Sequence, residues 1–530
     1  MKHFFVRSRA SKNILFNKNH ESRKFFSNIV KIPKMEFSTL NACICICTLL
    51  LSYLFALKGK LTNYMLLETV CLIVLNSCIS NRFLRVLIVL LCICNGLQFI
   101  NVFFVGGYIE ALTLENLDCA GDIGFYNIIK LSLIFLMYFT LLIKSKINLK
   151  HRKRYFPVLF CAILAITLSE KFPINSLFKT TKIVIENIFI PKDVGCNGDL
   201  FKKNNILKEN SSWNYNGKKN IILLFTEGTS LRVISKELTP NADALRNKSI
   251  VFENYYNHTA TTYRGIRGQL ISGIQHHGGC FDQKCHPESL QSILKNNGYY
   301  TIFISPHASH HPINNFFKEI GGFDKVYSET LSDKKLYKKI FEEYEFASKK
   351  NKPFLIVAYV VGTHEGMDSP DIKYKNGSNP YLNKFHNNDV WFGKFFEKYI
   401  KSSQVNNTIL VYTTDHCTHS SEGYNSTFNY PDLEWIDTIP LFLYNPSFDH
   451  KVYNANGLTS LTLTPTLLDM LGFHKVTNHF LGHSLFETGP HDSIEYQRFL
   501  GKHCIDTKSK KELDFKKDCY PAEEFYRYAG

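Results

Sequence analysis

Three apolar runs, each typical of a buried strand, end in residues that could bind a metal ion. Glu227 follows NIILLFT at 220–226, His364 follows PFLIVAYVVGT, and Asp415 with His416 follows NTILVYTT. Carboxylates and imidazoles are common ligands of divalent metals in proteins. Each residue alone could be a helix-terminal acid, a buried histidine or a strand-end turn. Their joint occurrence at strand ends indicates a metal-dependent site.

The elements that must position these residues are short apolar strands alternating with helix-length segments. We expect helices at 287–297, 333–350, 389–402 and 463–471, and strands at 220–226, 249–256, 299–305, 353–361, 407–413 and 439–444. This alternation is typical of a doubly wound, mostly parallel α/β sheet. Ligands bind beyond the carboxyl ends of the strands in such sheets, where the candidate residues lie.

The charge distribution predicts a membrane anchor, and it explains the positive net charge without a nucleic-acid partner. The chain has 530 residues and a net charge of +16. Residues 1–35 hold nine Lys/Arg against one acid, and residues 144–154 hold six Lys/Arg and no acid, so these two stretches carry +14. Both flank apolar runs, which is the positive-inside pattern. Five runs are candidate spanning helices: 38–57, 63–80, 83–105, 124–143 and 155–170.

The predicted topology is multi-pass in the inner (cytoplasmic) membrane. The loop 106–123 holds four acids and no Lys or Arg, so we expect it opposite the basic stretches. Five spans then place the C-terminal domain on the extracytoplasmic, periplasmic side. The expected divisions are a cytoplasmic tail, a five-helix transmembrane domain, a polar connector and a catalytic domain, at 1–37, 38–171, 172–218 and 219–530.

The 15 cysteines divide along the same line, since eight lie in the apolar runs. The others lie on the predicted outer side, where an oxidising compartment permits disulfides. Cys280 with Cys285, and Cys504 with Cys519, are the expected local pairs. An alternative is a zinc site made by His276, His277, Cys280, Cys285 and His286, although its spacing matches no standard pattern.

An ordered series of motifs resembles a known superfamily. The runs are NIILLFTEGTS, TPNADAL, IVFENYYNHTATTYRG, VVGTHEG, NTILVYTTDH, TPTLLDMLG and GHSLF. Together they resemble the alkaline phosphatase/sulfatase superfamily. With five preceding spans, the chain is most similar to its membrane-bound phospholipid head-group transferases: lipoteichoic acid synthase, phosphoglycerol transferases and phosphoethanolamine transferases. The resemblance implies a sulfatase-like sheet domain.

The resemblance also implies roles for single residues. Glu227, Asp415 and His416 match the metal ligands, and Thr262 matches the nucleophile, with Thr259 and Thr261 as rivals. His364 matches a segment that approaches the transferred group, and Arg264 could hold its phosphate, or be a solvated surface charge. Two carboxylates, one histidine and a threonine oxygen suit one divalent ion, Zn²⁺ or Mn²⁺.

The implied activity is a two-step transfer of a phosphoethanolamine or phosphoglycerol head group. The donor would be a phospholipid, the intermediate a phosphothreonine, and the acceptor an envelope glycan or lipid A. Two alternatives stay open: a hydrolase (phosphodiesterase) of the same fold, and a non-catalytic lipid-sensing protein. No Cys/Ser-x-Pro-Ser-Arg run is present, which disfavours a true sulfatase, and Cys417 follows His416 where many relatives have Gly.

Overall fold

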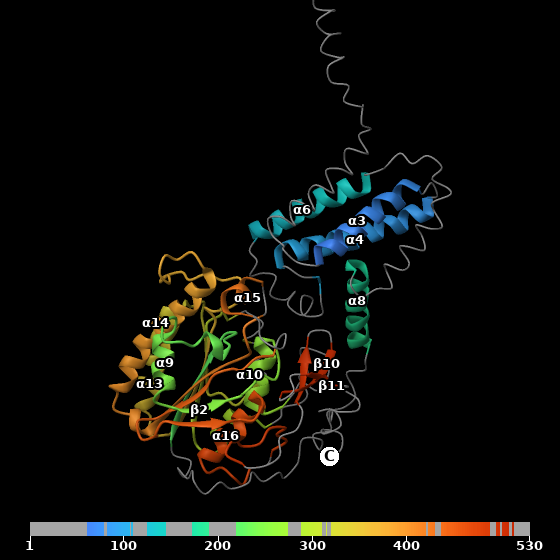
Figure 1. The fold of residues 1–530 in the computed structure, drawn as a ribbon. Helices are drawn as coiled ribbons and strands as arrows, with labels where there is room; N and C mark the ends of the chain where they lie inside the picture. The colour runs from blue at the N-terminus through green and yellow to red at the C-terminus, as the bar shows by residue number, and fades with distance from the viewer. Residues whose placement is uncertain are drawn as a thin grey trace, which may run out of the picture. The chain divides into compact units, whose positions relative to one another are not determined.

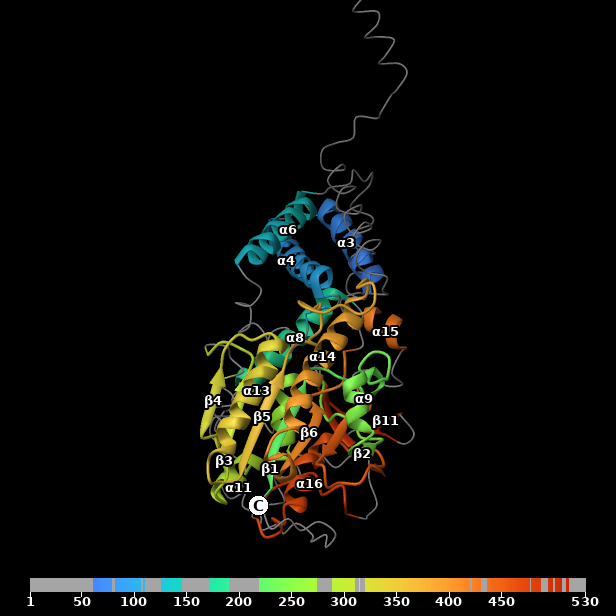
Figure 2. The same cartoon turned by 90° about the vertical axis from the view of Figure 1, so that its left-hand side faces the viewer.

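Strand β1 (Asn220–Thr226) is apolar along its length and buried at every position, so it forms the centre of an eight-stranded sheet. The strand order is β4-β3-β5-β1-β6-β7-β2-β8. Only β7 runs antiparallel to its neighbours. Figure 2 shows the strands edge to edge. The other bounds are β2 (Ile250–Glu253), β3 (Tyr300–Ser305), β4 (Lys325–Ser328), β5 (Phe354–Val360), β6 (Thr408–Thr414), β7 (Leu441–Tyr444) and β8 (Lys451–Asn454).

Helices cover both faces of this sheet. Alternate side chains of β1 point to opposite faces, so both faces are apolar and both are buried by helices. Ile221, Leu223 and Phe225 pack with α10 (Thr262–Ile271), α11 (Leu290–Asn296) and α16 (Leu463–Met470). Ile222 and Leu224 pack with α9 (Pro240–Arg246), α13 (Asp333–Ser348) and α14 (Pro380–Ile400). Figure 1 shows α9, α13 and α14 on one side of the sheet and α10 and α16 on the other.

The doubly wound, mostly parallel sheet expected from the sequence is therefore present, and its six expected strands all form. The short edge strands β4 and β8 were not expected. The helix expected at 389–402 begins earlier, at Pro380, where the Asn379 side chain accepts the amides of Tyr381 and Leu382. The helices α9, α10 and α15 (Glu422–Phe428) were also not expected.

This computed structural model describes only part of the chain, and the chain divides into two compact units. Unit 1 is Met1–Leu114 with Ala120–Ile183, and unit 2 is Glu115–Cys119 with Val184–Gly530. The described residues are 61–78, 82–105, 108–109, 125–144, 172–189, 219–273, 288–309, 314, 320–419, 422–429, 436–476, 478–487, 494–498, 501–507 and 511–513.

The described part of unit 1 contains three complete helices and most of a fourth. Three of them, α3 (Leu61–Cys78), α4 (Arg82–Val105) and α6 (Phe125–Lys144), coincide with the second, third and fourth expected spans. Within the described ranges, one segment, Phe83–Asn101, is long and apolar enough to cross a membrane. The first and fifth expected spans lie outside the described residues, so the five-helix bundle stays a prediction.

A buried polar network joins these apolar helices. Asn95 of α4 donates to Glu68 Oε1 on α3 (2.8 Å) and accepts from the Tyr138 hydroxyl on α6 (2.8 Å). Glu68 Oε2 accepts from the amide of Ile174 (3.2 Å), at the start of α8 (Pro173–Phe189). One carboxylate thus links α3 with α4 and with α8. The expected polar connector 172–218 therefore begins with a helix.

The C-terminal part of unit 2 forms a separate three-stranded antiparallel sheet of β9 (Ile494–Arg498), β10 (Gly501–Asp506) and β11 (Lys511–Leu513). It was not expected from the sequence. Cys504 lies in β10, while Cys280, Cys285 and Cys519 lie outside the described residues, as does the alternative zinc site. Among the cysteines whose side chains the structure describes, Cys71, Cys92, Cys94 and Cys417, no disulfide forms. Both disulfides stay predictions.

Candidate metal centre and nucleophile

The carboxyl ends of three adjacent strands converge on one site. The strand β1 lies between β5 and β6, and main-chain bonds continue beyond the strands: Glu227 N donates to Val360 O (2.9 Å) and Asp415 N to Thr226 O (3.4 Å). Glu227, Asp415 and His416 are buried there, and one ligand atom from each lies within 4.8 Å of the others. The sheet itself therefore gathers the three expected metal ligands.

The two oxygens of Asp415 have different surroundings. Its Oδ1 accepts from the amides of Gly228 (2.8 Å) and His416 (2.7 Å), which fixes the carboxylate. Its Oδ2 is buried and makes no hydrogen bond to the described residues. An orphaned carboxylate oxygen in a protein interior is costly, because it has lost its water without gaining a donor. This oxygen fits a metal ligand.

The imidazole of His416 is oriented by its own backbone. Its Nδ1 donates to the carbonyl of Cys417 (2.7 Å), so Nε2 faces the centre, 3.2 Å from Glu227 Oε1 and 3.5 Å from Asp415 Oδ2. A ring nitrogen held in this way is typical of a metal-bound histidine. The Glu227 carboxylate is fixed from the other side by the Tyr359 hydroxyl, which donates to Oε2.

The three groups strongly perturb one another. Burial, and then the charge of Glu227, raise the pKa of Asp415 to about 7. Burial alone would lower the pKa of His416, but the Asp415 charge and the hydrogen bond to Glu227 raise it to about 9. Burial alone would raise the pKa of Glu227, but the hydrogen bonds from His416 and Tyr359, together with the charges of the neighbouring histidines, lower it. Two buried carboxylates lie close together, and their negative charges require a nearby positive charge. A divalent ion would supply more positive charge than the single proton on His416.

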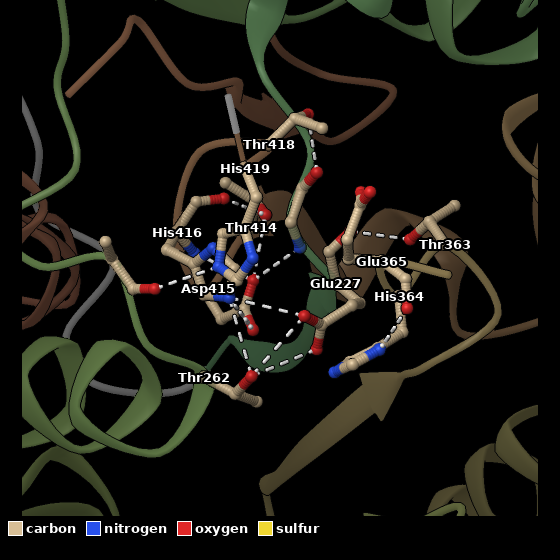
Figure 3. Close-up of polar contacts among 12 residues, drawn as sticks. Glu227, Thr262, Thr363, His364, Glu365, Thr414, Asp415, His416, Thr418 and His419 are labelled. Carbon is tan, nitrogen blue, oxygen red and sulfur yellow. Dashed lines mark hydrogen bonds and ion pairs between the residues drawn. The ribbon is translucent and has the colours of Figure 1, made fainter. Parts of the chain in front are cut away.

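Thr262 lies over this centre, at the first turn of α10. Its Oγ1 is 3.2 Å from Glu227 Oε2 and 3.4 Å from His416 Nε2, and Figure 3 shows its hydroxyl directed at both. The N-terminus of a helix favours negative charge, so this position suits an oxygen that becomes anionic. The hydroxyl completes a donor set of two carboxylates, one imidazole and one alcohol, which fits Zn²⁺ or Mn²⁺.

Close backbone contact holds α10 in this position. A Cβ at Gly265 would lie 2.2 Å from the carbonyl oxygen of Asp415, so only glycine lets the helix come this near. One turn later, the Gln269 amide donates to the carbonyls of Thr414 (2.8 Å) and Asp415 (3.2 Å). The helix that carries Thr262 is thus fastened to the strand end that carries Asp415.

The rival threonines differ in position from Thr262. Thr261 is the N-cap residue of α10, and its Oγ1 is buried without a hydrogen bond to the described residues. Thr259 is buried, and its carbonyl accepts from Asn257 (2.8 Å). The Thr262 side chain contacts two of the expected ligands, Glu227 and His416. Arg264 lies in the same first turn, half-buried, and its assignment to phosphate stays a prediction.

His364 lies on the loop that follows β5, at the mouth of the site. Its side chain is exposed, and its Nδ1 lies 2.9 Å from the carbonyl of Glu365. Figure 3 shows the ring on the side of Glu227 away from His416. The preceding residue, Thr363, donates to the carbonyl of Glu227 (2.5 Å), which ties the loop to the centre.

Several neighbours of the site were not expected from the sequence. Tyr359 reads as one more apolar strand residue, yet its hydroxyl faces Glu227. His419 stacks on His416, with ring centroids 4.9 Å apart. The ring centroid of His307 lies 5.9 Å from that of Tyr359. His307 follows the end of β3, so the strand-end reasoning applied to β1, β5 and β6 could have found it.

Comparison with known proteins identifies a family model and similar folds. Residues 219–473 match the family model described as Sulfatase. A protein of the alkaline phosphatase superfamily from Vibrio parahaemolyticus is similar in structure, with a TM-score of 0.52 and 18% identity over 66% of this chain and 96% of that chain. The lipoteichoic acid synthase LtaP from Listeria monocytogenes gives a TM-score of 0.50 and 18% identity, over 61% of this chain and 95% of that chain. These likenesses show a shared fold.

Proposed function

Since residues 219–473 form a sulfatase-family domain, we propose that the chain is a membrane-anchored, metal-dependent transferase of phospholipid head groups. The group would be phosphoethanolamine or phosphoglycerol, and the acceptor an envelope glycan or lipid A. The solved relative named a lipoteichoic acid synthase supports this class of reaction. One observation carries the proposal: the Thr262 hydroxyl lies within 3.4 Å of both Glu227 and His416.

A threonine at position 262 favours transfer of a phosphoryl group and disfavours hydrolysis of a sulfate ester by a formylglycine. Formylglycine is made from Cys or Ser, and neither residue stands at 262. A threonine hydroxyl can instead be a covalent nucleophile, provided that its oxygen is activated.

Glu227, Asp415, His416 and the Thr262 oxygen would hold the ion. When bound, the ion supplies Lewis-acid stabilisation of negative charge on that oxygen. The residues themselves hold the hydroxyl in place: α10 carries Thr262, and the Gly265 contact with Asp415 sets how near it comes. Such positioning contributes to catalysis because it removes the entropic cost of alignment.

In the first step the Thr262 oxygen attacks the phosphorus of the donor. A Thr262 O–P bond forms, the bond from phosphorus to the diacylglycerol oxygen breaks, and the Thr262 hydroxyl proton is released to solvent. His364 stands at the mouth of the site, where it would protonate the departing oxygen. In the second step an acceptor hydroxyl attacks the phosphorus of the phosphothreonine: an acceptor O–P bond forms, the Thr262 O–P bond breaks, and the proton lost by the acceptor hydroxyl balances the one that restores the Thr262 hydroxyl.

The helices of unit 1 support the membrane location. Large apolar side chains point outward on α4 and α6, and Phe83 is 79% exposed. Such surface is unfavourable in water and stable in lipid. The exposed residues are Phe83, Val86, Leu87, Leu90, Leu97, Ile129, Leu133, Leu136 and Met137. We propose that they face the bilayer in which the donor lipid resides, with the catalytic domain on the extracytoplasmic side.

The test is to incubate the purified full-length protein with a labelled phospholipid and no acceptor. We expect a head-group adduct on the peptide that contains Thr262, seen by mass spectrometry. Thr262→Ala should abolish the adduct and lower transfer by about 10³-fold or more, while Thr262→Ser should keep some activity. Thr261→Ala is the matched control and should retain the adduct.

The same assay distinguishes the alternatives. Release of free head group with no gain when acceptor is added would identify a hydrolase. Absence of any adduct, with full activity in Thr262→Ala, would refute covalent transfer. Mass spectrometry of envelope lipids and glycans, with and without the protein, would identify the head group and the acceptor.

A further inference from the structure

A buried lysine lies beneath the loop that carries His364. Lys384, in the second turn of α14, has a side chain that is only 1% exposed. Its Nζ donates to the carbonyl of His364 (3.2 Å) and lies 3.6 Å from Glu365 Oε2. Lysine is almost never fully buried without such partners. The contact of Lys384 with the backbone of His364 suggests a role in the site.

Stability alone is a poor reason for this lysine. Burial disfavours the ammonium and lowers the pKa of Lys384, although the carboxylates of Glu365 and Glu227 oppose that shift. A buried ion pair is often no more stabilising than apolar side chains of the same size. The Tyr381 and Phe385 rings lie 4.6 Å and 5.4 Å from Nζ, so an apolar residue at 384 would have packing partners.

Further polar contacts of the loop come from α13 and α14. The amide of Gly362 donates to Asp333 Oδ1 (3.1 Å), and a Cβ at Gly362 would lie 2.0 Å from Asp333 Oδ2. The Tyr381 hydroxyl donates to Glu365 Oε1 (2.5 Å). The loop is therefore held on both sides of His364, before it by Asp333 and after it by Tyr381.

We propose that Lys384 is a positioning residue for His364. Its ammonium binds the His364 carbonyl and the Glu365 carboxylate together, and so fixes where the imidazole stands at the mouth of the metal centre. Lys384 does not itself touch the reacting atoms. The inference rests on the proposed function, because it takes His364 as the group that protonates the diacylglycerol oxygen.

The proposal makes a prediction that a purely structural role does not. If Lys384 acts through His364, its loss should matter only when the leaving group needs a proton. Diacylglycerol leaves as an alcohol and needs one, whereas p-nitrophenolate leaves without one. The experiment therefore compares a phospholipid with the p-nitrophenyl phosphodiester of the same head group, using full-length protein in detergent.

With phospholipid, Lys384→Met should lower kcat by about 10- to 100-fold, as expected for a misplaced catalytic group, with little change in KM. With the p-nitrophenyl ester the loss should be no more than a few-fold. His364→Ala should show the same contrast and a larger loss on phospholipid, about 10² to 10⁴-fold. Lys384→Arg should recover part of the phospholipid activity.

The control is Lys394→Met, an exposed lysine on the same helix, 4.0 Å from the Trp391 ring; it should leave both activities unchanged. The double variant Lys384→Met/Glu365→Gln removes the stranded carboxylate if the single variant folds poorly. Equal losses on both substrates, or none, would overturn the role of Lys384. Wild-type protein inactive on phospholipid would instead refute the proposed function.

Discussion

Gly265 is the position where a single methyl group should separate metal binding from catalysis. In Gly265→Ala the new Cβ would start 2.2 Å from the Asp415 carbonyl oxygen and 2.8 Å from its carbon, and both are backbone atoms that cannot rotate away. To reach ordinary van der Waals contact, α10 must retreat by about 1 Å. Because Thr262 lies in the first turn of the same helix, its hydroxyl should retreat with it.

The magnitude follows from these contacts. Overpacking of this kind costs about 1–3 kcal/mol, so the melting temperature should fall by several degrees. A nucleophile misplaced by about 1 Å should lower kcat by roughly 10²-fold. Glu227, Asp415 and His416 lie outside α10, so the metal content should change little.

The assay measures the rate of adduct formation at Thr262, the metal content and the melting temperature of the same preparation. Gly268→Ala is the comparison on the same helix: its Cβ would first meet the His258 side chain, at 2.1 Å, rather than a ligand's backbone. Gly268→Ala should also have a lower melting temperature. For a similar fall in melting temperature, however, its rate of adduct formation should fall less than that of Gly265→Ala. Wild-type kinetics in Gly265→Ala would refute the reasoning that this contact positions Thr262.

Three further predictions concern the metal, the response to pH and the topology. Asp415→Ala should lose most of the bound divalent ion, measured by elemental analysis; unchanged stoichiometry would remove Asp415 from the ligands. Burial lowers the pKa of His258 from 6.5 to about 4, so the unfolded state binds more protons in this range, and stability should fall by about 3 kcal/mol as the pH drops from about 6.5 to 4. His258→Gln should flatten this part of the denaturant-unfolding profile, and an equally steep profile would contradict the assignment. Reporter fusions should place residues 1–35 and 144–154 in the cytoplasm and residue 530 outside; a cytoplasmic C-terminus would mean that a span was misassigned.

The sequence predicted the parts of the site that depend on the strands. The central strands are continuous apolar runs, so their ends, and with them Glu227, Asp415 and His416, could be located from hydrophobicity alone. Because neighbouring parallel strands end at one edge of a sheet, their convergence followed as well.

The helix α10 could not be found in this way. Its sequence, TYRGIRGQLI, contains two glycines, which disfavour a helix by about 1 kcal/mol each. The structure shows why they are there: a Cβ at Gly265 would collide with Asp415, and one at Gly268 with His258. Tertiary contact thus overrides local propensity at the helix that carries Thr262.

The first turns of α14 were missed for a different reason. Asn379 and Pro380 form an ordinary helix start, but the helix was expected only from residue 389, so Tyr381 and Lys384 were not placed beside the site. The edge strands β4 and β8 have only four residues each and begin with Lys, and short, charged strands give little hydrophobic signal.

The central position of β1 has a consequence for biosynthesis. Its first residue, Asn220, pairs with residues that lie 134 and 188 positions further along the chain. At synthesis rates of about 5–20 residues per second, the second partner strand follows by roughly 10 to 40 s. For that time a seven-residue apolar segment has no sheet to join, and such segments aggregate readily. The newly made NIILLFT segment is therefore where a chaperone should bind the growing chain.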